Sequence, residues 1–90
     1  MSEVRNNAAA SRFELEVEGQ IAVAIYRTSP GRIIITHTQV PHALRGRGLG
    51  STLVRGTLEW MRAQGFKVES RCPFVSAYLG KHPEFSDLLA

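Results

Sequence analysis

Alternating apolar and polar residues predict three consecutive β-strands in the first half of the chain. Residues 13–18 alternate strictly, which is the period of a strand with one apolar and one charged face. Residues 21–26 continue the alternation after a turn at Gly19-Gln20. Residues 32–40 are rich in β-branched side chains and follow a second turn at Ser29-Pro30-Gly31. Short turns between consecutive strands favour an antiparallel meander.

The second half of the chain predicts a helix, a strand and a second helix. Apolar residues recur at the helical period over residues 48–64, and Gly65 stands where a left-handed C-terminal cap is expected. Residues 66–71 alternate as a fourth strand, and Pro73 suits the first position of a helix ending at Lys81. Residues 84–89 allow one more helical turn. The order β-β-β-α-β-α predicts a compact α+β fold, with two main helices on a mostly antiparallel sheet.

The length and composition indicate one domain without unusual features. Ninety residues build a single hydrophobic core. Residues 1–10 are polar and alanine-rich without a clear period, so we expect a flexible N-terminal segment before one domain over residues 11–90. The single cysteine, Cys72, cannot form an internal disulfide, and no apolar run resembles a signal peptide or a membrane span. We therefore expect a free thiol in a cytoplasmic protein.

The clearest chemical signal is the loop Arg45-Gly46-Arg47-Gly48-Leu49-Gly50, between the third strand and the first helix. Free N–H groups at a helix start attract anions, glycines let the backbone approach, and arginines form forked hydrogen bonds to phosphate. The loop lacks the lysine of a Walker motif, and Ser51 replaces the third glycine of the dinucleotide fingerprint. The net charge of +3 suits an anionic ligand. These residues alone predict a phosphate site without specifying the phosphate.

The segment Arg45-x-x-Gly48-x-Gly50 resembles the acetyl-CoA pyrophosphate loop of the GNAT superfamily, usually written Q/R-x-x-G-x-G/A. The whole chain is similar to the small, single-domain members of that superfamily. The stretches that carry the resemblance are Phe13-Glu14-Leu15, His37-Thr38-Gln39-Val40, Gly46-Arg47-Gly48-Leu49-Gly50-Ser51, Cys72-Pro73-Phe74-Val75 and Lys81-His82-Pro83-Glu84-Phe85.

The resemblance implies an N-acetyltransferase that moves an acetyl group from acetyl-CoA to a primary amine of an unidentified protein or small molecule. It implies that the third strand separates from the fourth, so that its backbone pairs with the pantetheine arm while the loop amides hold the pyrophosphate. The residues that it places at acetyl-CoA are Thr38, Gln39, Val40, Arg45, Gly46, Arg47, Gly48, Leu49, Gly50, Ser51 and Tyr78. In larger relatives, a tyrosine in the region of Tyr78 protonates the leaving thiol.

Cys72 and His37 are the candidate catalytic residues. Cys72 directly precedes Pro73 at a helix start, a position that lowers a thiol pKa. The thiolate could accept the acetyl group, or the thiol could protonate the departing coenzyme A. Its strand parity with Val68 equally fits a buried structural cysteine. Histidine is a residue type that can act as a general base, but the parity of His37 with Ile33 also fits a hydrogen-bonded core histidine.

Two further functions stay open beside acetyl transfer. The small relatives commonly carry glutamate at position 39, and Gln39 cannot act as a general base, which leaves room for a coenzyme A binding module or sensor without turnover. A small basic nucleic-acid binder is least favoured, because the aromatic residues fall mostly at apolar-face positions. We expect acetyl-CoA as co-substrate and no metal, since the three histidines and one cysteine show no ligand spacing.

Overall fold

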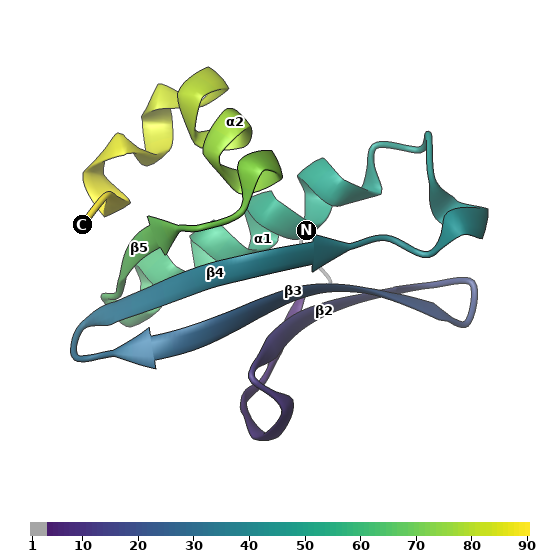
Figure 1. Cartoon of the computed structure of the whole chain (residues 1–90), viewed down its shortest axis with the longest axis horizontal. Coiled ribbons are helices and arrows are strands. Elements are labelled where there is room, and N and C mark those ends of the chain that lie inside the picture. Colours follow the sequence, from purple (N-terminus) through teal and green to yellow (C-terminus); the bar gives the residue numbers. More distant parts are fainter. Residues whose placement is uncertain (1–3) are drawn as a thin grey trace.

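The strands and helices that the sequence pattern predicts form a sheet with helices packed on it (Figure 1). The structure is a computed structural model, and it describes residues 4–90 of the chain. The strands are β1 (Arg5–Asn7), β2 (Arg12–Val17), β3 (Gln20–Ser29), β4 (Arg32–Gln39) and β5 (Lys67–Ser70). The helices are α1 (Leu49–Gln64) and α2 (Pro73–Lys81), with 3₁₀ segments at Ala8–Ala10, His42–Leu44 and Pro83–Leu88. The predicted α+β fold with two main helices is confirmed.

The strands lie side by side in their sequence order, from β1 to β5. Neighbours from β1 to β4 run antiparallel, whereas β5 runs parallel to β4 because α1 carries the chain back across the sheet. The sheet is therefore mostly antiparallel, as the sequence predicts. Pairing between β4 and β5 runs from Arg32 opposite Lys67 to Ile35 opposite Ser70. Residues 36–39 of β4 consequently extend beyond β5, which is visible in Figure 1.

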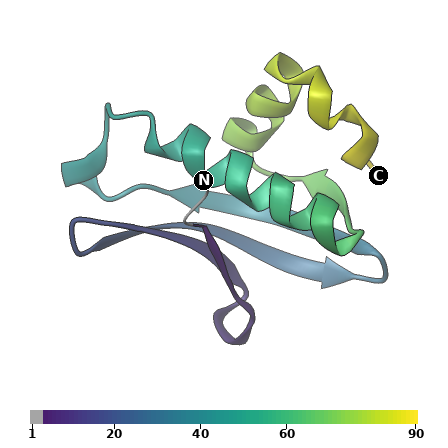
Figure 2. The ribbon, with the colours of Figure 1, turned by 180° about the vertical axis from the view of Figure 1, so that it is seen from behind.

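Both α-helices cover the same face of the sheet (Figure 2). The inner side of α1 buries Leu53 and Met61 in one cluster with Phe13 of β2 and Ile35 of β4. Every one of these side chains is fully buried, so the hydrophobic effect fixes α1 against the sheet. Gly65 ends α1 with φ 81°, the left-handed cap that the sequence predicts.

The sequence predicts a flexible segment over residues 1–10, and part of this segment forms a strand in the structure. Residues 1–3 lie outside the described residues. Arg5–Asn7 forms the edge strand β1, and the Tyr26 hydroxyl donates a hydrogen bond of 2.6 Å to Asn6 Oδ1. Asn7 Nδ2 donates to the Glu14 carboxylate at 3.0 Å. Polar side-chain bonds thus attach this strand, which explains why no apolar period reveals it.

A β-bulge in β4 corrects the expected placement of His37. Ile25 pairs with His37 and Tyr26 pairs with Ile35, so Thr36 is an extra residue that has no partner in the register. A bulge inverts the alternation of every residue that follows it. Parity predicts that His37 shares the buried face of Ile35. The structure shows instead that His37 is exposed. The Thr36 hydroxyl donates to the Ile25 carbonyl at 3.2 Å and holds the bulge.

Candidate functional site

The loop that follows β4 adopts a backbone that requires glycine at two positions. Gly46 has φ 81° and Gly48 has φ 72°, both in the left-handed region that side chains disfavour. Gly48 is also the N-cap of α1, where it supplies no side-chain cap, and the first turn of α1 carries no acidic residue. The first N–H groups of α1 thus keep their partial positive charge for an external anion.

A pocket of about 240 Å³ opens over this helix start. Its lining residues are Val40, Leu44, Arg45, Gly46, Gly48, Leu49, Gly50, Ser51 and Phe74. We call it the loop pocket. Seven of the residues predicted to contact acetyl-CoA lie on its wall: Val40, Arg45, Gly46, Gly48, Leu49, Gly50 and Ser51.

Phe74 is a wall residue that the sequence analysis did not single out. A Cβ at Gly50 would lie 2.9 Å from Phe74 Cζ, so the ring rests directly on the first turn of α1. The Phe74 side chain is nevertheless 44% exposed. The sequence signal that could have identified it is a large apolar residue directly after Pro73, at the start of a helix. Its exposure in the structure is what marks it as a wall residue.

The two loop arginines point to different partners. Arg45 Nε donates to the Val40 carbonyl at 3.3 Å, and Arg45 belongs to the wall of the loop pocket. Arg47 instead pairs with Glu18 in the turn after β2, at 2.9 Å. This hydrogen bond and the charge attraction raise the pKa of Arg47 and lower that of Glu18. An exposed pair of this kind contributes little, so Arg47 stays free to exchange Glu18 for a stronger anion.

Beyond the end of β5, β4 meets the start of α2 through two side chains. Thr38 Oγ1 and Cys72 Sγ lie 3.5 Å apart, across the region where β4 no longer pairs with β5. Val40 and Phe74, each two residues further along, both line the loop pocket. Cys72 and Thr38 do not themselves line the loop pocket; each stands two residues before one of its wall residues.

Cys72 is held as the N-cap of α2 and is only 5% exposed. Ser70 fixes its backbone, because the Ser70 hydroxyl donates to the Cys72 carbonyl at 3.0 Å and accepts from the Cys72 N–H at 3.3 Å. Burial raises the pKa of the thiol, but hydrogen bonds from the Thr38 hydroxyl and from the N–H groups of Val75 and Phe74 outweigh burial, and the pKa is lowered. These hydrogen bonds therefore stabilise the thiolate, which is the nucleophilic form of cysteine.

The remaining predicted residues lie apart from this thiol. His37 and Gln39 are exposed on β4, and His37 Nδ1 lies 3.2 Å from the Thr36 hydroxyl. Tyr78 is buried on α2, more than a helical turn beyond Cys72, where its ring stacks on His82 at 3.9 Å. The structure thus brings Thr38 and Cys72 together, and leaves His37 and Tyr78 outside that contact.

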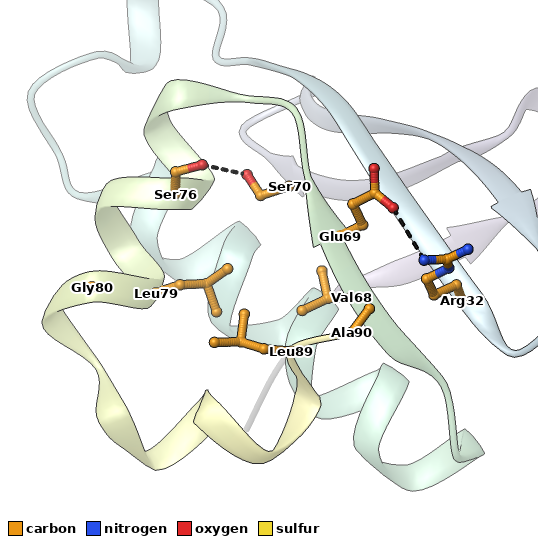
Figure 3. Close-up of a pocket in the computed structure, with 9 residues that line it drawn as sticks. All are labelled: Arg32, Val68, Glu69, Ser70, Ser76, Leu79, Gly80, Leu89 and Ala90. Atoms are coloured by element: carbon orange, nitrogen blue, oxygen red, sulfur yellow. Dashed lines mark hydrogen bonds and ion pairs between the residues drawn. The ribbon is translucent and has the colours of Figure 1, made fainter.

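A larger pocket, about 560 Å³, lies elsewhere, between β5, α2 and the last described residues (Figure 3). Its wall combines the apolar side chains of Val68, Leu79 and Leu89 with a hydroxyl pair, Ser70 and Ser76, at 2.8 Å. It contains none of the residues predicted to contact acetyl-CoA. Size alone does not identify a site. We favour the loop pocket because its helix-start N–H groups offer defined chemistry and Cys72 stands two residues before its wall residue Phe74.

Within residues 4–90, no group of three or more histidine, cysteine, aspartate or glutamate side chains is arranged to hold a metal ion. No helix in the same part of the chain has the length and apolar character needed to cross a lipid bilayer.

Comparison with known proteins places these features in context. Residues 12–88 match the family described as GCN5-related N-acetyl-transferase. Protein NATD1 of Homo sapiens is 32% identical over 83 residues, covering 89% of this chain and 74% of the human protein. Protein NATD1 of Gallus gallus is 27% identical over 84 residues, covering 90% and 76%. The solution structure of a GCN5-like protein from Staphylococcus aureus superimposes with a TM-score of 0.74 at 26% identity, covering 98% of this chain and 87% of that chain.

Proposed function

Because the chain belongs to the GCN5-related N-acetyltransferase family, we propose that it moves an acetyl group from acetyl-CoA to a primary amine. The observation that carries the proposal is the anion-binding helix start in the wall of the loop pocket, with the Cys72 thiol of lowered pKa two residues before the wall residue Phe74. The amine belongs to an unidentified protein or small molecule. We further propose that the reaction takes place in the cytoplasm.

The loop pocket fits the diphosphate of coenzyme A. The uncapped N–H groups at the start of α1 and the Arg45 guanidinium would hold the two phosphates, with Arg47 able to join them. Glycine at 46 and 48 lets the backbone approach the anion closely. Residues 36–39 of β4 have no β5 partner. Apart from the Thr38 backbone, which hydrogen-bonds the Cys72 thiol, the backbone groups on this edge that do not pair with β3 would meet the amides of the pantetheine arm.

Cys72 is our candidate nucleophile, because its lowered pKa favours the thiolate. The Cys72 Sγ–carbon bond forms as the carbon–sulfur bond of the thioester breaks, and the sulfur of coenzyme A leaves as a thiolate. A neutral amine then attacks acetyl-Cys72, and the thiolate of Cys72 leaves. Thr38 Oγ1, 3.5 Å from Sγ, stabilises the negative charge on sulfur before and after transfer.

The amine must lose a proton during this transfer. His37 lies on the face of β4 opposite Thr38 and Cys72, and Gln39 cannot accept a proton, so in this proposal solvent water takes the proton from the amine. Tyr78 is buried beyond Cys72 and, in this proposal, shapes the cofactor site without transferring a proton.

A panel of amines with separation of acetylated product by mass spectrometry tests the function. Wild type should acetylate at least one amine and should accumulate acetyl-Cys72 when the amine is omitted. Cys72→Ala should retain coenzyme A binding and lose most of its turnover. Undiminished turnover by Cys72→Ala would exclude the thiol from the reaction. If Cys72→Ala loses turnover but wild type accumulates no acetyl-enzyme, the thiol acts as an acid and not as a nucleophile.

A coenzyme A binding module without turnover is the second candidate, and Gln39 favours it. The exposed amide stands at the end of β4, where a carboxylate would have supplied a base. Stabilisation by acetyl-CoA together with no acetylation of any amine would support the module. Acetyl-CoA at a hundred times its dissociation constant should stabilise the fold by about 2.7 kcal/mol. If acetyl-CoA does not stabilise the fold, both candidates are contradicted.

A further inference from the structure

The outer edge of β5 is the site of a groove where the strand pairing of the sheet ends. β5 is the last strand in the order, and β4 occupies one of its sides. On the other side, within residues 4–90, one bridge joins Val68 to Leu89, and the Ala90 N–H donates to the Val68 carbonyl at 3.1 Å. The pocket of about 560 Å³ lies along this side, with Ser70, Leu89 and Ala90 in its wall (Figure 3). We call this pocket the edge groove.

Hydrogen bonding to β4 fixes the direction of the backbone groups of β5. The Arg71 N–H donates to the Ile35 carbonyl of β4 at 2.8 Å. Because the backbone groups of successive residues in a strand point to opposite sides, the N–H and C=O of Ser70 face the outer edge. Val68, which faces the same way, is already bridged to Leu89, and the pairing ends there. The backbone of Ser70 is thus placed to accept an added strand.

The wall of the edge groove comes from both faces of the sheet. Val68 and Leu79 line it on the face that the helices cover, and Leu89, which is 50% exposed, adds apolar surface at its rim. Arg32 and Glu69 line it from the opposite face. Side chains of an extended peptide alternate between the two faces of a sheet, so a strand added to β5 would use both parts of this wall.

The uncovered face of the sheet beside the groove carries an excess of positive charge. Arg32 and Arg71 both pair with the Glu69 carboxylate, at 3.5 and 2.7 Å, so one negative charge is shared by two arginines. Lys67 adds a further cation, and its ammonium donates to the backbone carbonyl of Asp87. The Asp87 carboxylate has an arginine partner of its own. Acidic side chains on an added strand would therefore complement this face.

We propose that the edge groove binds an extended peptide in which apolar and acidic residues alternate. The peptide adds as a strand to β5 and exchanges main-chain hydrogen bonds with Ser70. Its apolar side chains pack against Leu79 and Leu89, and its acidic side chains face Arg32 and Arg71. The groove shares no wall residue with the loop pocket, so this binding goes beyond acetyl transfer and is tested without coenzyme A.

Amide NMR of the full chain, titrated with a blocked hexapeptide of alternating leucine and glutamate, tests the proposal. Wild type should show shifts centred on β5 and α2, and the Ser70 amide should exchange more slowly with solvent when the peptide is bound. A hexapeptide with lysine in place of glutamate should bind about tenfold more weakly, because like charges then meet. N-methylation of the leucine amides and of the glutamate amides should have opposite effects, since only one set faces β5: one abolishes binding and the other leaves it.

Two variants test the charge on the uncovered face. Arg32→Gln should bind the leucine–glutamate peptide roughly threefold more weakly, since an exposed ion pair contributes modestly. Arg27→Gln removes the same charge from an exposed position on β3, two strands from the groove, and should bind as wild type does. Both variants should unfold at the wild-type Tm, because neither side chain belongs to the core.

Four results would overturn the proposal. The first is a wild-type chain that shows no shifts at β5 with the leucine–glutamate peptide. The second is an equal effect of the two N-methylated sets, which would exclude main-chain pairing. The third is equal weakening by Arg32→Gln and Arg27→Gln, which would attribute binding to net charge. The fourth is a dimer that forms through the Ser70 edge without peptide, detected by sedimentation and by the same amide shifts, because the occupant would then be a second copy of this chain.

Discussion

Replacement of Gly48 by alanine tests whether the loop depends on its left-handed backbone. Gly48 has φ 72° and ψ 15°, and nothing lies within 4 Å of the position that a Cβ would occupy. The cost of Gly48→Ala is therefore conformational and involves no clash. A left-handed α conformation costs an L-residue roughly 1–2 kcal/mol, and the lower entropy of alanine in the unfolded chain offsets part of that. We expect a net destabilisation of about 1 kcal/mol.

A matched substitution separates this strain from the general effect of adding a methyl group. Gly80 lies inside α2 without a positive φ, and nothing lies within 4 Å of its Cβ position either. Alanine is preferred to glycine in a helix by up to about 1 kcal/mol. Gly80→Ala should therefore stabilise the fold, so that the same chemical change has opposite signs at the two positions.

Thermal unfolding followed by circular dichroism measures both variants. For a domain of this size, 1 kcal/mol corresponds to a change in Tm of roughly 4–8 °C. We expect Gly48→Ala below wild type and Gly80→Ala above it. A Gly48→Ala variant at or above the wild-type Tm would refute the claim that the left-handed backbone at position 48 requires glycine. Equal decreases at both positions would show that backbone conformation does not determine the result.

Three further predictions concern the thiol, the sheet edge and the core. Thr38→Val removes a hydrogen bond that lowers the pKa of Cys72, so alkylation by iodoacetamide should require higher pH than in wild type. Hydrogen bonds from Asn7 and Arg12 lower the pKa of Glu14 in the folded protein. The Glu14 carboxylate therefore stabilises the fold above the ordinary glutamate pKa, and this contribution is lost as the pH falls through the pKa of Glu14 in the folded protein. Urea unfolding should therefore separate Glu14→Gln from wild type at neutral pH and less below about pH 4. Phe85→Ala should cost about 3–5 kcal/mol in urea unfolding, because the ring is fully buried.

Periodic patterns made the main elements predictable from the sequence. The strict alternation over residues 13–18 correctly placed Phe13 and Leu15 of β2 in the core, and the buried positions Leu53 and Met61 of α1 follow the helical period. Gly65 marked the end of α1 because a left-handed cap is a local requirement of the backbone. These features depend on residues near one another in sequence, and a pattern of residue types records them directly.

Features that depend on contacts between distant segments were not predictable in this way. β1 is attached by polar bonds such as that between Tyr26 and Asn6, which leave no apolar period. The open face of Phe74 depends on the approach of α2 to Gly50, twenty-four positions earlier by residue number. Arg47 was expected at a phosphate, and its pairing with Glu18 depends on how the turn after β2 folds beside the loop.

The bulge in β4 connects the largest error in the prediction with the chemistry of the site. In an unbroken strand, His37 would share the buried face of Ile35, and Thr38 would point to the opposite face. The extra residue Thr36 inverts this order, so that His37 is exposed and Thr38 lies 3.5 Å from the thiol of Cys72. The same irregularity therefore frees a titratable side chain and supplies the hydroxyl that lowers the thiol pKa. Bulges commonly reorient side chains next to active sites, and here the reorientation is what gives Cys72 its partner.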